Sequence, residues 1–275
     1  MQEMIQPLNR DRLSVLVAVL LLGSVLFRFI ELPEQTWKLE LLGSPLDIQV
    51  NSAWLLTALM VGLVCTGTNL ILHDHPYLEE AAGRPIYISW ILPGLMAGLA
   101  AYLLTQLTAW PLWIGGLLIT GVSISLVITA EYTAISPQDA SYPTARLSLN
   151  MLAYLLAFSL FSLIYRTRSR SLVTATLMLV TAILLSLDLL SVADTQFRRV
   201  SLFAGIVGLI IGQSTWALNY WQISAWTSGL FLLLIFYTVT NVAHQYLLER
   251  LSPSVLAEFA VVAIVVLVLV LVNTQ

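Results

Sequence analysis

The pattern of hydrophobic and polar positions divides the chain into long apolar runs separated by shorter polar connections. The runs are continuous and mostly about 20 residues long, which is the length an α-helix needs to cross ~30 Å of hydrocarbon. They predict membrane-spanning helices, because the strands of a membrane barrel alternate over about 10 residues. About nine spans are predicted, with eight or ten as alternatives: 13–30, 52–72, 87–105, 111–130, 147–165, 172–192, 200–217, 224–243 and 254–272.

The predicted architecture is all-α, a polytopic transmembrane helical bundle that forms a single domain over residues 1–275. Between the first two spans, segment 31–51 alternates apolar and polar residues in two arms around Gly43-Ser44-Pro45. This pattern predicts a short hairpin, or two extended pieces, lying at the membrane interface. A plain connector is the alternative interpretation.

Proline and glycine positions predict where helices bend or approach each other. Pro93-Gly94 falls inside the span 87–105, where it predicts a kink or a packing contact. Gly205, Gly208 and Gly212 recur at helical spacing within one span. Small residues on a membrane helix let a neighbouring helix come near without lipid between them.

The composition agrees with lipid as the main solvent of this chain. Hydrophobic residues make up 59% of it and charged residues 10%, with a mean hydropathy of +0.89, whereas soluble domains carry about 25% charged residues. The 12 basic and 15 acidic residues form no polybasic patch, so the expected partner is the lipid bilayer and not nucleic acid. The single cysteine, Cys65, excludes an internal disulfide and a cysteine-rich metal site.

The transition from span to polar loop is clearest in the stretch Trp110–Arg146. The apolar run 111–130 ends at Glu131, and a polar loop with two prolines follows it. If the spans 111–130 and 172–192 are neighbours, carboxylates could meet at one membrane face as a general acid/base or cation site, with solvated helix ends as the alternative. The candidate polar cluster consists of Glu131, Tyr132, Asp139, Arg146 and Asp188.

Glu131 and Tyr132, if they are functional, should point from the water interface into the helix bundle. A carboxylate that faces inward needs a partner, because an unpaired buried charge is expensive. The sequence therefore predicts a contact from Glu131 to Arg146, or to Arg84 from another connection, with the Tyr132 ring packed against the bundle.

Four further polar residues form the candidate interfacial set: His73, Asp74, His75 and His244. The two imidazoles of His73-Asp74-His75 would share a face on an extended segment, but a metal site needs three or four ligands and no His or Cys companion is near. We therefore interpret them as polar caps and expect no metal and no cofactor. Tyr237, Asn241 and His244 share one helix face, which favours an interhelical polar contact.

No Asp, Glu, Lys, Arg or His falls near the middle of any predicted span. Arg28 lies one turn from a span end and three residues before Glu31, so snorkelling and a local ion pair explain it. Ion-coupled transporters usually place ionisable groups at the bilayer midplane, so this class is disfavoured.

Several short motifs carry a resemblance to a known family: Ile91-Leu92-Pro93-Gly94-Leu95, Ala130-Glu131-Tyr132 with Pro137 and Asp139, Leu218-Asn219-Tyr220-Trp221, and Leu256-Ala257-Glu258-Phe259. Over about residues 50–270 the chain resembles an uncharacterised, domain-of-unknown-function family of bacterial multi-pass membrane proteins of the Chloroflexota type. The resemblance implies an all-helical fold in a bacterial inner membrane, and it implies no reaction.

Three classes of function follow from these observations. The charge-free span centres favour a non-enzymatic membrane component or assembly subunit, with other membrane proteins or a second copy as partners. Glycine-rich spans and Pro93-Gly94 favour a carrier of a lipid or a neutral apolar solute. Interfacial carboxylates favour an intramembrane enzyme acting on a lipid-linked substrate, so the question of enzymatic activity stays open.

Overall fold

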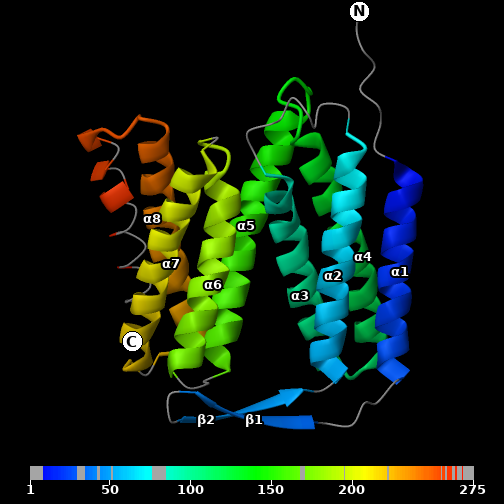
Figure 1. Cartoon of the computed structure of the whole chain (residues 1–275). Helices are drawn as coiled ribbons and strands as arrows, with labels where there is room; N and C mark the ends of the chain where they lie inside the picture. The colour runs from blue at the N-terminus through cyan, green and yellow to red at the C-terminus, as the bar shows by residue number, and fades with distance from the viewer. Residues whose placement is uncertain are drawn as a thin grey trace, which may run out of the picture. The chain divides into compact units, whose positions relative to one another are not determined.

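The computed structural model describes residues 9–29, 35–41, 44–50, 52–75, 85–167, 171–194, 196–221, 223–254, 256–257, 259–261, 264 and 268 (Figure 1). The chain divides into two compact units. Unit 1 comprises Met1–Glu80 and Leu92–Ala145, and unit 2 comprises Ala81–Ile91 and Arg146–Gln275. The organisation of residues 1–275 as a single domain stays a prediction.

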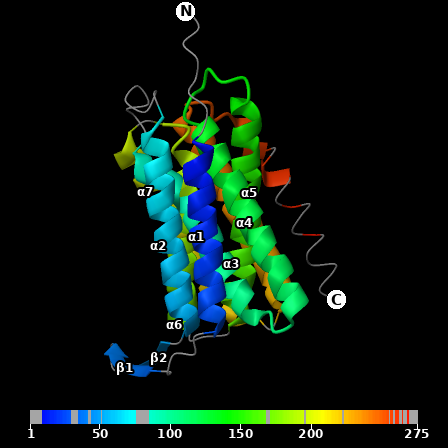
Figure 2. The same ribbon diagram turned by 90° about the vertical axis from the view of Figure 1, so that its right-hand side faces the viewer.

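Unit 1 is built from helices and one hairpin: α1 (Arg10–Phe29), β1 (Gln35–Leu41), β2 (Ser44–Val50), α2 (Ser52–His73), α3 (Ile91–Gln106) and α4 (Trp110–Thr133). The strands β1 and β2 pair antiparallel, with Gln35 opposite Val50 and Leu41 opposite Ser44. Segment 31–51 therefore contains a hairpin and is not a plain connector. Helix α1 lies beside α2 and α4, as Figure 2 shows.

The core of unit 1 is apolar and depends on glycine at close approaches. Its buried residues include Leu20, Met60, Val64 and Ile128. A Cβ added at Gly94 would lie 2.9 Å from Sγ of Cys65 on α2, so the glycine allows α2 and α3 to come together. Of the two outcomes expected at Pro93-Gly94, the structure therefore has the packing contact.

Helix α3 begins at Ile91, so Pro93 lies in its first turn. A short 3₁₀ helix, η1 (Ile86–Trp90), directly precedes α3 in the chain. The first N–H groups of a helix have no intrahelical partner, so proline is tolerated there without a kink. The same reasoning corrects the loop expected at 131–146. Pro143 occupies the first turn of α5, and α4 continues to Thr133, so Glu131 and Tyr132 are helical.

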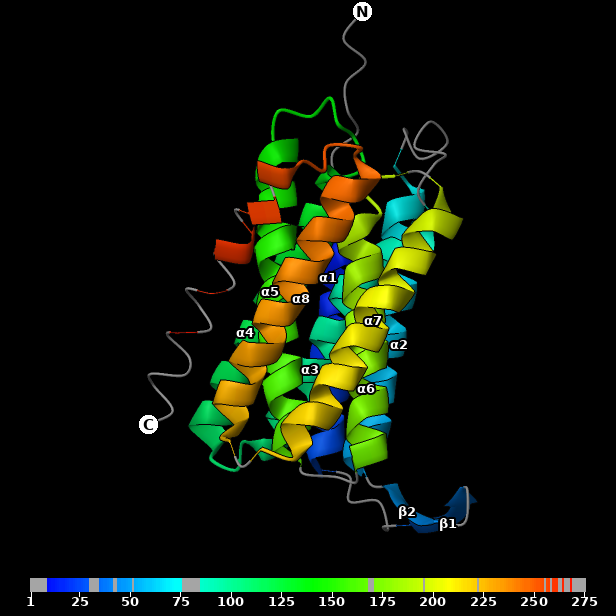
Figure 3. The same ribbon diagram turned by 90° about the vertical axis from the view of Figure 1, so that its left-hand side faces the viewer.

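Unit 2 contains η1 and four long helices: α5 (Tyr142–Arg166), α6 (Ser171–Leu190), α7 (Phe197–Asn219) and α8 (Ala225–Leu247). Helices α6, α7 and α8 pack side by side, as Figure 3 shows. A Cβ added at Gly208 would lie 3.0 Å from the backbone oxygen of Leu179 and closer still to the Ile183 side chain. Gly208 and Gly212 thus lie at the α6–α7 contact, as predicted, whereas Gly205 has nothing within 4 Å of its Cβ position.

Helix α8 ends in a left-handed turn. Glu249 has φ 55°, its N–H donates to the oxygen of Tyr246 at 3.0 Å, and the N–H of Arg250 donates to the oxygen of Gln245 at 3.0 Å. These two bonds form a Schellman motif, in which glycine usually occupies the left-handed position. Glutamate at this position carries a strain that glycine would not have.

Within the described residues, eight helices are long and apolar enough to cross a membrane. This confirms the predicted all-α class of membrane-spanning helices, and their bounds differ from the predicted spans by five residues at most. The predicted ninth span, 254–272, falls mostly outside the described residues. The eight helices fit a multi-pass integral membrane protein.

Candidate functional site

Polar residues of unit 1 gather where α1 begins and where α2 and α4 end. We call the buried and half-buried members the boundary cluster: His75, Glu131, Tyr132, Ser136 and Asp139. His75 follows α2, Glu131 and Tyr132 lie in the last turn of α4, and the other two lie in the connection from α4 to α5. The cluster therefore forms at the boundary between the apolar spans and their polar connections.

Local sequence explains the turn that places His75. Helix α2 ends at His73, and the N–H of His75 then donates to the oxygen of Leu72 at 3.0 Å in a tight turn. The next residue is Pro76, and a residue before proline avoids the α conformation. The turn directs the His75 side chain inward, where only 4% of the residue is exposed.

The His75 ring packs edge-on against Tyr132, with 4.6 Å between the ring centroids. Burial lowers the pKa of His75 below its ordinary value of 6.5, and the negative charge of Asp139 opposes this shift in part. His75 is thus neutral at pH 7, with one ring nitrogen able to donate and the other able to accept a hydrogen bond. Sequence reasoning treated His75 as an interfacial cap, but its ring is buried.

Glu131 and Tyr132 are both buried, and the Tyr132 ring packs in the core of unit 1, as predicted. They are 1% and 6% exposed, and Tyr132 belongs to the core cluster that also contains Ile71 and Leu72. The predicted contact between Glu131 and Arg146 would join unit 1 to unit 2, so it stays a prediction. The convergence of Asp188 with the carboxylates of unit 1 stays a prediction for the same reason.

Asp139 has a local structural role. Its carboxylate oxygen Oδ1 accepts a hydrogen bond from the N–H of Ser141 at 2.8 Å, and its own N–H donates to the oxygen of Ser136 at 3.2 Å. These contacts shape the turn that leads into α5 at Tyr142. An aspartate that binds the backbone two residues later is typical of such turns.

Asp74 forms an ion pair with Arg12, with 2.7 Å between Nη1 and Oδ2. The pair links the start of α1 to the end of α2 at the rim of the boundary cluster. Both side chains are exposed by a third or more, so the pair contributes at most about 1 kcal/mol. His73, next to Asp74, is exposed, and its interfacial position stays a prediction.

Arg28 makes contacts that sequence reasoning missed. Its Nη1 donates to the oxygen of Leu107 at 3.1 Å and its Nη2 to the oxygen of Thr108 at 2.8 Å. The guanidinium also lies 5.6 Å from the ring centroids of both Trp110 and Trp113. The end of α1 thus binds the α3–α4 turn. In the sequence, the two tryptophans that follow this turn were the available indication of this contact. Glu31, the expected partner, lies outside the described residues.

Polar side chains also join the helices of unit 2. Nδ2 of Asn241 on α8 donates to Oη of Tyr154 on α5 at 3.0 Å, which confirms a polar contact between helices on this face. Oη of Tyr165 donates to the oxygen of Leu218 on α7 at 2.8 Å. His244 is half-buried, and Asp188 is 3% exposed within α6.

Within the part of the chain that the structure describes, no three His, Cys, Asp or Glu side chains come together as metal ligands. The boundary cluster combines a buried carboxylate, a neutral imidazole and a phenol at the end of a span. These groups could exchange protons or hold a polar group that enters from the membrane boundary.

The chain belongs to a family described as "Protein of unknown function (DUF5656)", whose model matches residues 32–273. The match confirms the resemblance to an uncharacterised family. It begins at residue 32 and not near residue 50, so the hairpin segment is part of the match. No curated protein and no solved structure matches the chain.

Proposed function

We propose that this protein is a non-catalytic component of a bacterial inner membrane that assembles with another membrane protein or with a second copy of itself. The family match brings no reaction with it, and eight apolar helices fit an integral membrane protein. The bacterial location rests on the sequence resemblance.

The observation that carries this proposal is the use of polar side chains to connect helices. Arg28 binds the α3–α4 turn, Asn241 binds Tyr154, and Tyr165 binds the end of α7. Each contact fixes one helix against another, and a hydrogen bond between membrane helices stabilises their association by about 0.6–2 kcal/mol. Such contacts support a rigid framework whose outer surface is available for assembly.

The outer face of α7 supports the proposal of an assembly role. Gly205 lies between the exposed residues Leu202, Ile206 and Leu209, and its Cβ position has nothing within 4 Å. Glycine at this position contributes no close approach within the chain itself. In membranes, glycine lets the backbone of a partner helix come near.

The test is to purify the full chain from its native membrane into lipid nanodiscs and to measure the mass of the protein assembly. We expect a complex of fixed stoichiometry heavier than the 30.4 kDa chain. Gly205→Leu should dissociate it without lowering the melting temperature, while Gly115→Leu, at another open position, should leave it intact. A single chain at all protein concentrations, with no co-purifying protein at a fixed ratio, would reject the proposal.

The boundary cluster favours a second candidate, an intramembrane enzyme acting on a lipid-linked substrate. Glu131 is 1% exposed, and the neutral His75 lies against Tyr132 at the end of the spans. A buried carboxylate at this depth could act as general base toward a head group. Glu131→Gln separates a catalytic role of Glu131 from a structural one. If the variant fails to complement a deletion strain but its melting temperature is unchanged or raised, Glu131 is catalytic. If the melting temperature falls, Glu131 is structural.

A further inference from the structure

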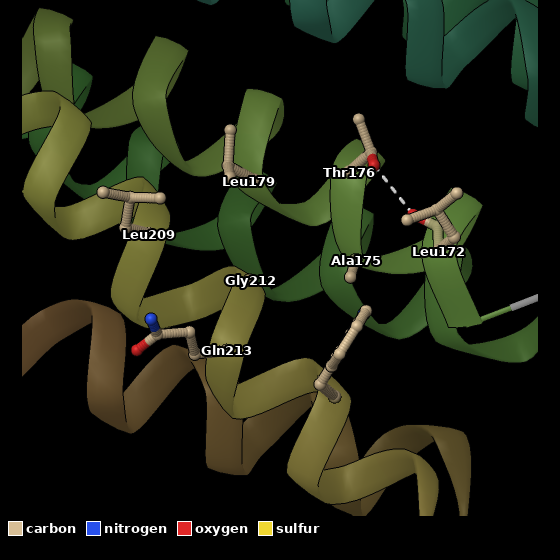
Figure 4. Close-up of a pocket in the computed structure, with 8 residues that line it drawn as sticks. Leu172, Ala175, Thr176, Leu179, Leu209, Gly212 and Gln213 are labelled. Carbon is tan, nitrogen blue, oxygen red and sulfur yellow. Dashed lines mark hydrogen bonds between the residues drawn. The ribbon is translucent and has the colours of Figure 1, made fainter. Parts of the chain in front are cut away.

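Unit 2 has a groove of about 250 Å³ between the first half of α6 and the last half of α7 (Figure 4). Its floor consists of small residues, Ala175 and Gly212, between large apolar ones. Leu172, Leu209 and Trp216 are 48%, 55% and 51% exposed, so the groove opens on the outer surface of this helix pair. The lining residues are Leu172, Ala175, Thr176, Leu179, Leu209, Gly212, Gln213 and Trp216.

The length and depth of the groove match the upper part of a lipid chain. Leu172 to Leu179 covers eight residues of α6, and Leu209 to Trp216 covers eight of α7, which is about 10 Å along each helix. One leaflet contributes about 15 Å of hydrocarbon. The groove therefore begins at the membrane boundary and stays within one leaflet.

Gln213 places an amide in this apolar surface. Its side chain is exposed, and the residue lies six positions before Asn219, the last residue of α7, which corresponds to about 9 Å from the helix end. An amide left without a hydrogen bond in hydrocarbon is unfavourable by several kcal/mol. At this depth the ester carbonyls of a lipid are suitable acceptors, so the polar lining residue favours a lipid over a wholly apolar solute.

A positive charge lies at the end of α5, which is at the same end of unit 2 as the end of α7. Arg166 ends α5 and is exposed, and the neighbouring Tyr165 binds the oxygen of Leu218 near the end of α7. Neither 160–175 nor 216–226 contains an Asp or Glu to compensate this charge. A guanidinium binds a phosphate group with paired hydrogen bonds.

From these observations we propose that the α6–α7 groove binds an anionic phospholipid. The upper acyl chain lies over Ala175 and Gly212, the ester region accepts a hydrogen bond from Gln213, and Arg166 binds the head-group phosphate. The groove adjoins the proposed assembly face around Gly205 and shares Leu209 with it, whereas Ala175, Gly212 and Gln213 belong to the groove alone.

Lipid retention by the purified full chain tests the site. The protein is placed in nanodiscs of equal parts phosphatidylglycerol and phosphatidylcholine with identical acyl chains, extracted gently, and its bound lipids are counted by native mass spectrometry. We expect at least a fivefold preference for phosphatidylglycerol. Arg166→Gln should reduce the preference to less than twofold, and Thr176→Trp, which fills the groove from an exposed lining position, should remove the bound lipid of either kind.

Two variants control for general effects. Arg198→Gln removes an exposed charge from the opposite end of α7, and Leu177→Trp adds a large ring to an exposed position of α6 outside the groove. Both should retain lipid like the natural chain. Equal retention of the two lipids by the natural chain, or an unchanged preference in Arg166→Gln, would overturn the proposal. Dissociation of a protein complex by Thr176→Trp, with lipid retention unchanged, would show a protein in the groove instead.

Discussion

The pair Gly205 and Gly208 gives the sharpest test of how α6 and α7 pack. Both are on α7, three residues apart, so Gly→Ala changes the helix propensity equally at the two positions, by up to about 1 kcal/mol in favour of alanine. At Gly205 the new methyl group has nothing within 4 Å. At Gly208 it lies 3.0 Å from the backbone oxygen of Leu179, which cannot rotate away, and closer to Ile183.

The difference between the two variants therefore isolates the packing contribution at Gly208. Overpacking of a filled contact costs about 1–3 kcal/mol. At roughly 2–4 °C per kcal/mol, Gly208→Ala should melt about 2–12 °C below Gly205→Ala. The melting temperature is measured in detergent from intrinsic tryptophan fluorescence, to which Trp216 on α7 contributes. Equal melting temperatures would show that α6 and α7 do not approach each other at Gly208.

Three further predictions concern charges and backbone strain. The pKa of His75 is lowered in the folded chain, so below about pH 6.5 the unfolded chain takes up a proton more readily than the folded chain. Acidification below that pH therefore lowers the free energy of unfolding. The melting temperature of His75→Phe should fall less than that of the natural chain between pH 7.5 and 5.5, and parallel curves would refute this. Glu249→Gly should raise the stability by about 0.5–1 kcal/mol in thermal melts, because it relieves a left-handed residue with φ 55°, whereas Glu249→Ala should not. Arg28→Ala should lower the free energy of unfolding by about 2–3 kcal/mol, because two carbonyl oxygens lose a charged donor. Arg12→Ala, which removes an exposed ion pair, should lower it by less than about 1 kcal/mol. Similar losses in the two variants would contradict this ranking.

The sequence predicted the spans well because length and apolar composition alone define them. It also predicted the burial of Tyr132 and the polar contact at Asn241, since a polar group inside a bundle needs a partner. It did not separate Gly205 from Gly208. In lipid both faces of a helix are apolar, so the pattern does not show which glycine faces a neighbour.

Contacts between residues far apart in sequence were the other part that the pattern could not predict. Arg12 pairs with Asp74 across α1 and α2, and the turn after α2 buries His75 although its neighbour His73 is exposed. Both depend on how the helix ends are placed in three dimensions. Pro76 explains the turn after α2, but the local pattern does not show that the His75 ring packs against Tyr132 of α4.

The contact made by Arg28 has a consequence for the synthesis of the chain. Its two acceptors, the oxygens of Leu107 and Thr108, follow it by 79 and 80 residues. At about 5–20 residues per second, the ribosome needs roughly 4–16 s to produce them after Arg28 has been made. During this interval the guanidinium must remain hydrated, which its place near the end of α1 permits. The first helix is therefore synthesised before this contact can form, and its end is held by Arg28 only after the α3–α4 turn has been made.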